Sequence, residues 1–574
     1  MIFSNVCLAK NVLVRKAEGI ETAGSLNILF TDKTGTITKG ELEVVDTILA
    51  NAKSVSLSNL SSQLLDKIEF SICKNTTAKF DNNLNIIGGN LTDKALCKFI
   101  GHSAFFKLDA IKIQAFQEFN SKNKFSQVQI DGTTYYKGAP EKLIQNANSY
   151  YNEDGEIIAL DKDVINKKIN SLAEHSMRVI VLAESRKPLV RDIISDCLTI
   201  IAVLAIRDDV RKEARDAIKD VQRAGVQVVM ITGDRSETAI AIAKDAGIIT
   251  LPTDLAVSSS QLKEMSDEEI KNIIPRLRVV SRALPLDKSR LVRICQEMNL
   301  VTGMTGDGVN DAPALKKADV GFALASGTEA AKEQSKIVIL DDNFRSIKDA
   351  ILYGRTIYNN ILKFCIFQLA INFTAVIVSA IAPFFGVAEP LKVAHLLFVN
   401  LVMDGLGASM LGSEGAKDEY MDEKPKRRDE SLISRKMFRR IVLTSTYFII
   451  LSFVYLFVPY FNGLFENNEQ FLTSYFVLFV LTSLFNAFNV RDDYLNIFTG
   501  FNENRNVLKV FFSIAFIQMA IVYSGAIRSL GSISKIFSCY AFPIQYYLLI
   551  IALAFTIVLF DCLRKIIDKK FNKL

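Results

Sequence analysis

The sequence predicts an α/β part that carries an inserted α+β domain and is followed by an all-α membrane bundle of about six helices. Three observations support this fold class. Short apolar runs alternate with helix-like stretches before residue 50 and again after residue 197, which is typical of a mainly parallel sheet. Between residues 50 and 196, polar connections rich in Asn, Ser and Lys separate short elements. After residue 345, long apolar stretches dominate the chain.

The elements of the α/β part follow from the apolar pattern. Residues 10–24 read as a stalk, and the apolar run 26–30 as the first strand. After the insertion, the strand-like run at 197–205 is followed by an amphipathic helix at 211–223. The remaining expected elements are a helix at 237–247 that ends in glycine and strands at 226–231, 300–304, 318–325 and 337–340.

Composition narrows the function classes. The chain has 574 residues and a mean hydropathy of +0.22, so it is too long for one domain and rich in apolar residues. Its net charge of +6 is modest for this length and is concentrated in loops beside the apolar stretches, so no nucleic-acid partner is expected. The 8 cysteines include no Cys-x-x-Cys pair, which argues against a disulfide framework or a zinc site.

The α/β part is organised around Asp32. This residue follows the first predicted strand and precedes a Gly- and Thr-rich turn, so it should lie at the edge of the sheet where ligands bind. Three later stretches also end apolar runs with small and acidic residues. Together they would supply hydroxyl and amide donors, a cation and two more carboxylates, and they are residues 230–234, 283–288 and 305–311.

Two of these stretches resemble a known family. Residues 32–38 (DKTGTIT) resemble the phosphorylation motif of P-type ATPases, and residues 305–316 (TGDGVNDAPALK) resemble their hinge motif. The resemblance covers essentially the whole chain. It implies a haloacid-dehalogenase-like, Rossmann-like phosphorylation domain in 25–49 and 197–345, an inserted nucleotide-binding domain in 50–196, a six-helix transmembrane domain in 346–574, and a stalk remnant in 1–24.

The chemistry that the family performs suits these residues. Phosphoryl transfer from ATP needs an in-line oxygen nucleophile and cancellation of negative charge. The resemblance implies that Asp32 is the nucleophile and forms an aspartyl phosphate, and that Lys288 neutralises the transferred group. Magnesium would be held by the carboxylates of Asp32 and Asp307 and the backbone carbonyl of Thr34. The other implied catalytic residues are Lys33, Thr232, Gly233, Asp234, Asn310 and Asp311. The last two would orient the site, although they could instead only fix their loop.

The inserted domain is expected to bind ATP. Residues 116–126 (FQEFNSKNKFS) loosely resemble the family's adenine-binding segment, with Phe119 stacking on the base and Lys124 on the phosphate side. Residues 137–141 (KGAPE) are closer to the nucleotide-domain signature. The resemblance implies roles in nucleotide binding for Lys137, Gly138, Arg178 and Arg282, and it marks residues 90–96 as a diverged Gly-Asp-Pro-Thr-Glu segment. Taken one at a time, each residue could be an ordinary core or solvated side chain.

Six stretches after residue 345 are long and apolar enough to span a bilayer. The loops at 424–440, 491–509 and 564–573 are basic and therefore expected on the cytosolic side, whereas 461–470 lacks Lys and Arg and is expected outside. This predicts a multi-pass protein of the plasma membrane with cytoplasmic catalytic domains. The spans are expected at 364–385, 393–411, 441–460, 472–490, 510–527 and 542–560.

Polar residues inside two of the spans predict a cation site. Gln368 and Asn372 lie four residues apart, hence on one helix face, and Asn400 and Asp404 repeat that spacing on the next helix. The amides could alternatively serve helix–helix hydrogen bonding. The two segments resemble the ion-site helices of calcium pumps, closest to the plasma-membrane type. Calcium is the expected cation, with manganese, sodium, potassium and protons as alternatives.

Some motifs of the family do not occur in this sequence. There is no Thr-Gly-Glu-Ser actuator loop, no Pro-Glu-Gly-Leu-Pro segment and no first set of four spans. We therefore expect a chain that binds ATP and can phosphorylate itself but does not pump alone, with a separately encoded N-terminal half as a candidate partner. Two other readings remain: a soluble-type haloacid-dehalogenase phosphohydrolase, which the KGAPE insertion and six spans disfavour, and a non-catalytic nucleotide-binding membrane protein.

Overall fold

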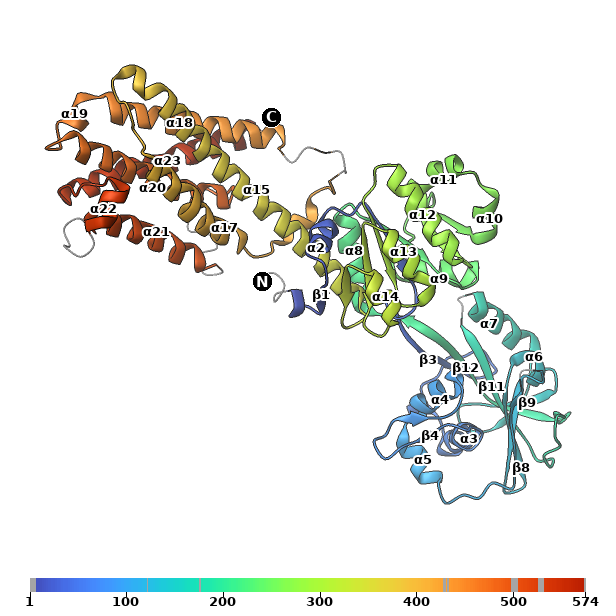
Figure 1. The fold of residues 1–574 in the computed structure, drawn as a ribbon. Coiled ribbons are helices and arrows are strands. Elements are labelled where there is room, and N and C mark those ends of the chain that lie inside the picture. Colours follow the sequence, from blue (N-terminus) through green and yellow to red (C-terminus); the bar gives the residue numbers. More distant parts are fainter. Residues whose placement is uncertain are drawn as a thin grey trace. The chain divides into compact units, whose positions relative to one another are not determined.

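The computed structural model describes residues 7–120, 122–174, 177–426, 430, 433–496, 504–524 and 531–571. The chain divides into two compact units, which are drawn in Figure 1. The first, called here the α/β unit, contains residues 10–19 and 26–349. The second, called the helical unit, contains the described residues of 1–9, 20–25 and 350–574. The expected combination of a mixed α/β part and apolar helices is confirmed.

The first sheet of the α/β unit has the strand order β1-β18-β17-β16-β2-β13-β15-β14. Strand β2 (Ile28–Asp32) lies inside this sheet, between the parallel strands β16 (Thr302–Gly306) and β13 (Gln227–Ile231). The other parallel strands are β14 (Leu255–Ser258), β15 (Leu277–Ser281), β17 (Val320–Leu324) and β18 (Ile337–Ile339). Its core includes Phe30, Ile231, Val280 and Met304, all of them fully buried.

One expectation about the N-terminal stretch is wrong. Residues 10–24 were expected to form a stalk, but β1 (Val12–Val14) pairs antiparallel with β18 and closes the edge of the first sheet. Val12 is fully buried there. All three residues are apolar, and they add a short strand that is followed by the helix α2 (Ala17–Gly24).

Helices lie against the first sheet. They are amphipathic or short, as expected for elements that cover a sheet buried on both faces. Their bounds are α8 (Lys212–Arg223), α9 (Ser236–Asp245), α10 (Ser259–Glu264), α11 (Asp267–Ile273), α12 (Pro285–Glu297), α13 (Ala312–Lys317) and α14 (Glu329–Gln334).

The second sheet of the α/β unit is mostly antiparallel and has the order β10-β9-β12-β11-β8-β7-β6, with β3 paired to β12. Its strands are β3 (Thr38–Ile48), β6 (Ala115–Asn120), β7 (Phe125–Ile130), β8 (Thr133–Gly138), β9 (Ala147–Tyr151), β10 (Ile157–Ala159), β11 (Arg178–Ser185) and β12 (Leu198–Val210). Its helices are α3 (Ser62–Cys73), α4 (Leu91–Ile100), α5 (His102–Leu108), α6 (Pro140–Leu143) and α7 (Lys162–Glu174). A small separate hairpin is formed by β4 (Lys79–Phe80) and β5 (Ile86–Ile87).

The chain was expected to return to the first sheet at residue 197, but it does not do so there. Strand β12 was expected to resume the first sheet, but it pairs with β11, β9 and β3 in the second. Alternate residues of β12 enter two apolar clusters on opposite faces of that sheet, Val203 one cluster and Leu204 the other. Because both faces of the strand are covered there, its apolar run is satisfied without the first sheet.

The helical unit contains the expected membrane helices. Among the described residues, six helices are long and apolar enough to cross a membrane, which confirms the expected number. One of them, α20 (Asn468–Arg491), is enclosed by its neighbours, since 89% of its most apolar stretch is buried. The spans are Phe344–Phe385, Val393–Gly412, Arg435–Phe457, Asn468–Arg491, Asn506–Tyr523 and Gln545–Lys570. Residues 427–429, 497–503 and 525–530, on which parts of the expected basic loops and of the fifth span fall, lie outside the described residues.

The second span is not a uniform α-helix. It begins as α16 (Val393–Leu397), continues as a π-helical turn over Phe398–Met403, and ends as α17 (Asp404–Gly412). The first span is the long helix α15 (Phe344–Ile381), and the next ones are α18 (Arg435–Phe457) and α20 (Asn468–Arg491). The last two are α21 (Asn506–Tyr523) and α23 (Gln545–Phe571).

Candidate functional site

Asp32 is the last residue of β2, and its backbone and side chain are both held. Its N–H donates to the hydroxyl of Thr305 on the neighbouring strand β16 at 2.8 Å. Its Oδ1 accepts the N–H of Lys33 at 2.7 Å. These bonds leave the other carboxylate oxygen, Oδ2, directed at a cation.

That cation is Lys288, on the first turns of α12. Its Nζ donates to Asp32 Oδ2 at 2.9 Å and to Asp311 Oδ1 at 2.7 Å. The side chain is mostly buried, which alone would lower the pKa of the ammonium, but the charges of Asp32 and then Asp311 outweigh burial and raise it above its ordinary value. Lys288 is therefore a fixed positive charge beside the Asp32 carboxylate.

Helix α12, which carries Lys288, is fastened at its N-terminus. Proline 285 starts the helix, and Asp287 Oδ2 accepts the Leu284 N–H at 2.9 Å and the hydroxyl of Ser259 at 2.6 Å. Because Asp287 directly precedes Lys288, this cap fixes the backbone position from which the lysine side chain extends toward Asp32.

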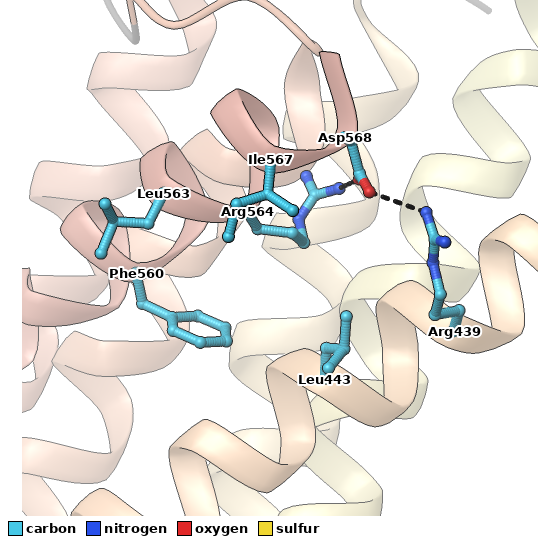
Figure 2. Close-up of a pocket in the computed structure, with 7 residues that line it drawn as sticks. All are labelled: Arg439, Leu443, Phe560, Leu563, Arg564, Ile567 and Asp568. Atoms are coloured by element: carbon cyan, nitrogen blue, oxygen red, sulfur yellow. Dashed lines mark hydrogen bonds and ion pairs between the residues drawn. The ribbon is translucent and has the colours of Figure 1, made fainter. Parts of the chain in front are cut away.

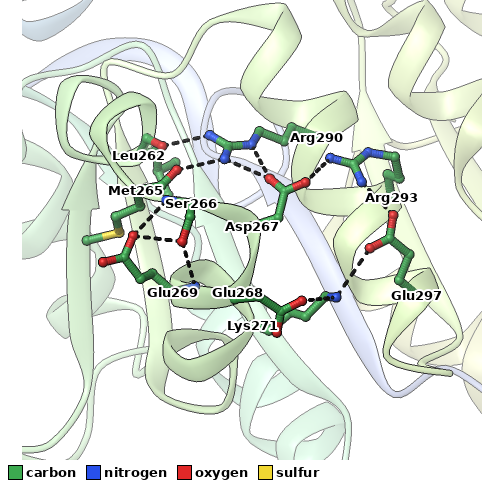
Figure 3. A network of polar contacts seen from close by, with 10 residues as sticks. All are labelled: Leu262, Met265, Ser266, Asp267, Glu268, Glu269, Lys271, Arg290, Arg293 and Glu297. Carbon is green, nitrogen blue, oxygen red and sulfur yellow. Dashed lines mark hydrogen bonds and ion pairs between the residues drawn. The ribbon is translucent and has the colours of Figure 1, made fainter.

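The outer side of α12 is fastened by an ion-pair network, shown in Figure 3. Asp267, at the start of α11, accepts from Arg290 Nε at 2.9 Å and from Arg293 Nη2 at 2.6 Å. Arg290 also donates to the carbonyls of Leu262 and Met265, both at 2.7 Å. The network thus joins α12 to the end of α10 and the start of α11.

Three carboxylates gather at the sheet edge. Asp32, Asp307 and Asp311 can each present one oxygen within 4.8 Å of the others. The pKa of Asp307 is raised by burial and then by the negative charges of Asp32 and Asp311. A divalent cation would relieve this repulsion, and carboxylate oxygens are the ligands that magnesium prefers, so the group fits the expected ion.

The other two expected magnesium ligands, Asp307 and Thr34, differ in their burial. Asp307 follows β16 and is half-buried in the carboxylate group. Thr34 lies in the exposed turn after β2, where the N–H groups of Ile37 and Thr38 donate to the Lys33 carbonyl at 3.1 and 3.2 Å. Asp311, which the sequence marked only as an orienting residue, offers a third carboxylate.

The loop after β13 faces the same edge. Lys33 Nζ lies 2.9 Å from Asp234 Oδ2, so the residue after Asp32 is paired with this loop. The N–H of Asp234 donates to the hydroxyl of Thr232 at 3.2 Å. Arg282 donates its N–H to the Asp234 carbonyl at 2.9 Å but exposes its side chain, and Asn310 is exposed as well. Gly233 lies between the two polar residues of this loop.

One residue near the site was missed by the sequence reasoning. Asp208, near the end of β12, accepts the hydroxyl of Thr38 at 2.6 Å and the N–H of Gly40 at 2.9 Å. It also lies 3.9 Å from Lys33 Nζ. It thereby ties β12 to the segment that leaves Asp32. The only signal in the sequence was a run of charges at 207–209, which does not reveal a long-range partner.

In the second sheet, the structure brings two of the expected nucleotide-binding cations to one helix terminus. Lys137 is buried and bonds Asp93 at 2.6 Å and the Asn75 carbonyl. Arg178 is exposed and donates to the hydroxyl of Thr92 at 2.7 Å. Thr92 and Asp93 are consecutive in the first turn of α4, so one turn of helix fixes both cations.

The other expected nucleotide-binding residues lie on neighbouring strands of that sheet. Phe119 on β6 is 50% exposed, which leaves its ring free for stacking. Lys124 is exposed and pairs with Glu141 at 2.8 Å. Gly138 ends β8, and a Cβ there would lie only 2.6 Å from the Cβ of Phe125, so close strand packing explains the glycine.

In the helical unit, Asp404 is the central residue of the expected cation site. It is 6% exposed, and its Oδ2 accepts the side-chain amide of Gln368 at 3.0 Å. The other oxygen, Oδ1, is buried and has no hydrogen-bond partner among the described residues. A buried carboxylate oxygen without a partner is costly, and a bound cation would satisfy it.

The two asparagines of the expected site are less enclosed. Asn372 is half-buried, and Asn400 is exposed although it lies four residues before Asp404. Asn400 lies within the π-helical turn Phe398–Met403, which explains why it differs from Asp404, because four residues span less than one turn of a π-helix and more than one turn of an α-helix. The i, i+4 spacing therefore does not give Asn400 and Asp404 the same surroundings.

Comparison with known proteins gives two family matches. Residues 26–319 match the haloacid dehalogenase-like hydrolases, and residues 388–567 match the C-terminus of cation-transporting ATPases. The chain is similar to Calcium-transporting ATPase 1 of Saccharomyces cerevisiae, with 32% identity over 606 residues covering 98% of this chain and 62% of the relative.

Plant proteins are similarly related. Calcium-transporting ATPase 9, plasma membrane-type, of Arabidopsis thaliana is 34% identical over 541 residues, covering 87% of this chain and 49% of the relative. Probable calcium-transporting ATPase 6, plasma membrane-type, of Oryza sativa subsp. japonica is 34% identical, covering 89% of this chain and 53% of the relative. The chain thus spans about half to three fifths of the length of these relatives.

Proposed function

The chain belongs to the P-type cation-transporting ATPases, and from that premise we propose that its α/β unit transfers the γ-phosphoryl group of ATP to Asp32. The observation that carries this proposal is the pair of bonds from Lys288 Nζ to Asp32 and Asp311, with Asp307 in the same group of carboxylates. A nucleophile, a cation and a place for a divalent ion lie together at the end of one strand.

The proposed reaction forms one bond and breaks one. An Asp32 carboxylate oxygen attacks the γ-phosphorus, and the bond from that phosphorus to the bridging oxygen breaks, so that ADP leaves with the electron pair. Lys288 offsets the negative charge of the transferred group, and Thr232 and Gly233 are proposed to donate to its oxygens. Magnesium, when bound by Asp32, Asp307 and the Thr34 carbonyl, would supply further charge neutralisation, and Asp311 is a further carboxylate available to it.

ATP is proposed to bind at the second sheet. The exposed ring of Phe119 supports base stacking, while Lys124, Lys137 and Arg178 supply positive charge. Arg282 is proposed to contribute from the first sheet, and Gly138 to allow close approach of strands. The pairing of Lys137 with Asp93 and of Arg178 with Thr92 supports a preformed arrangement of these cations.

The helical unit is proposed to bind the transported cation in a membrane, with the α/β unit in the cytoplasm. The buried, unpartnered Oδ1 of Asp404 supports this role, with Gln368, Asn372 and Asn400 as further oxygen donors. Calcium is proposed because the relatives are named calcium-transporting ATPases and because calcium accepts oxygen ligands of mixed type.

The test is acid-stable labelling of the full chain with ATP that carries labelled γ-phosphate. Label is expected on the wild type, absent from Asp32→Asn, and retained by the control Asp154→Asn, whose residue is exposed and remote from the site in sequence. Calcium is varied in parallel, with manganese, sodium and potassium as comparison ions. Equal labelling of wild type and Asp32→Asn would contradict the proposal.

A further inference from the structure

A pocket lies between the two helix ends of the helical unit that are richest in basic residues, and it is shown in Figure 2. It has a volume of about 630 Å³. One helix, α18, contributes residues from its first turns, and the other, α23, contributes residues from its last turns. Its lining consists of Arg439, Leu443, Phe560, Leu563, Arg564, Ile567 and Asp568.

The polar side of this α18–α23 pocket is a set of ion pairs that joins the two helices. Asp568 accepts from Arg439 Nη2 at 2.7 Å and from Arg564 Nη1 at 2.9 Å (Figure 2). Arg564 also donates from Nε to Asp561 at 2.7 Å, and Lys565 lies 2.9 Å from the other oxygen of Asp561. Three cations and two carboxylates leave one positive charge.

One nitrogen of this set is unsatisfied. Arg564 is 9% exposed, and its Nη2 has no hydrogen-bond partner among the described residues. A buried guanidinium N–H without an acceptor is unfavourable, so an anionic oxygen that enters the pocket far enough to reach Nη2 would stabilise it. Arg439, whose side chain is 60% exposed, can present its remaining N–H groups to the same ligand.

The other side of the pocket is apolar. Leu443, Leu563 and Ile567 are exposed to different degrees, and the ring of Phe560 stacks on Tyr447 of α18 with centroids 4.4 Å apart. A ligand that fits both sides must carry an anionic group at one end and a hydrocarbon body at the other.

The place of the pocket along the helices favours a lipid. Helix α18 begins at Arg435 and Lys436, and α23 ends at Lys569 and Lys570, so the pocket lies where apolar spans meet basic flanks. Such a level corresponds to the headgroup region of a leaflet, and basic flanks of this kind mark the cytosolic side.

We propose that the α18–α23 pocket binds one anionic phospholipid. Its phosphodiester accepts from Arg564 and Arg439, and its single negative charge balances the single positive charge of the ion-pair set. One acyl chain lies along Leu443, Phe560 and Leu563. The bound lipid holds the end of α18 to the end of α23, and this role is independent of phosphoryl transfer at Asp32.

The experiment is native mass spectrometry of the full chain purified in detergent and titrated with phosphatidylglycerol, with phosphatidylcholine of the same acyl chains, or with inorganic phosphate. Tightest retention of one phosphatidylglycerol is expected for the wild type, together with a higher melting temperature. Arg439→Gln is expected to weaken that binding about fivefold, the effect of one basic residue near an anionic headgroup. Lys569→Gln is the matched control, because it removes an exposed charge from the end of α23 that lies outside the lining.

The outcomes separate the sources of the ligand. If Arg439→Gln weakens binding while Lys569→Gln does not, the site is assigned. Equal loss in both variants would mean attraction by the basic flank as a whole and would overturn the proposal, and so would equal binding of both lipids. Stabilisation by inorganic phosphate as large as that by phosphatidylglycerol would also overturn it, because the apolar side would then contribute nothing. Leu563→Glu, which opposes an acyl chain without touching the ion pairs, is expected to weaken lipid binding as well.

Discussion

Lys288 donates to two carboxylates from a buried position, and its positive charge offsets the repulsion between them. Asp32 is held by hydrogen bonds to the hydroxyl of Thr305 and to the N–H of Lys33, so its Oδ2 has a fixed position from which it accepts the lysine N–H. In the proposed reaction, preorganised charge of this kind would lower the barrier to phosphoryl transfer, because no rearrangement would be needed when the ATP phosphate arrives.

Replacement of this cation should reduce phosphorylation without abolishing ATP binding. Lys288→Gln is expected to slow formation of the acid-stable label by about 10²-fold or more, the usual effect of removing one electrostatic donor. Single-turnover labelling measures the rate. Lys263→Gln, at an exposed position on α10, serves as control and should label at the wild-type rate. A normal rate in Lys288→Gln would mean that the lysine only stabilises the fold.

Asp404 allows a second test at the residue scale. Asp404→Asn keeps the shape of the side chain but removes the charge that a cation would pair with. If phosphorylation depends on calcium as proposed, the calcium concentration for half-maximal labelling is expected to rise about tenfold or more. Glu389→Gln, an exposed carboxylate between the first two spans, should leave it unchanged. An unchanged calcium dependence in Asp404→Asn would place the cation elsewhere.

At the scale of elements, α12 is the helix on which the candidate site depends. It is capped by Asp287 next to Lys288, and its outer side is tied to α11 by Asp267. The pKa of Asp267 is lowered by its hydrogen bonds to Arg293 and then Arg290. A carboxyl with a lowered pKa in the folded state stabilises the fold above its unfolded pKa of about 4, and that contribution is lost as the pH falls through the lower, folded pKa.

Asp267→Asn should therefore destabilise the chain in a pH-dependent manner. At pH 7 the variant is expected to melt below the wild type, and the difference should shrink as the pH falls from about 4 through the lower pKa of the folded carboxyl. Thermal unfolding at several pH values measures this. Glu268→Gln removes an exposed neighbour that pairs with Lys271 at 2.7 Å, and it should show little effect at any pH. A pH-independent difference for Asp267→Asn would argue against the ion pairs.

The helical unit contains a buried ion pair at the end of α20. Arg491 and Glu414 are both almost fully buried, with Arg491 Nε 2.8 Å from Glu414 Oε1, and Asn504 donates to the same oxygen at 3.0 Å. Glu414→Gln removes the charge that Arg491 pairs with, and it is expected to cost about 3–5 kcal/mol of stability. The exposed pair Lys426–Glu430 is the control, since Glu430→Gln should cost no more than about 1 kcal/mol. If Glu414→Gln and Glu430→Gln lost comparable stability in thermal unfolding, the expected difference between the buried and the exposed ion pair would be refuted.

At the scale of the whole molecule, the local patterns of the sequence were enough for the types of element. Apolar runs marked β2, β13, β16 and β17, and their polar ends marked the edge at which Asp32, Lys288 and Asp307 gather. Six long apolar stretches likewise predicted six membrane helices among the described residues. These features depend on residues close together in the chain.

What could not be predicted depends on pairing over long distances. Strand β12 is as apolar as a strand of the first sheet, and only its partners β3 and β11 assign it to the second. Asp208 and the edge strand β1 were missed for the same reason. The exposure of Asn400 was missed because a π-helical turn leaves no mark in an i, i+4 spacing.

That turn, Phe398–Met403, holds one residue more than ordinary helical winding needs, and Asp404 stands directly at its end. If this turn were rewound to α geometry, its extra residue would move into the adjoining stretch of helix. That stretch would then rotate by roughly 100° about the helix axis. Such a slip would swing the carboxylate away from Gln368 while the rest of the span stays wound. A single step of winding would therefore replace the orientation of this carboxylate toward its amide partner with an orientation away from it.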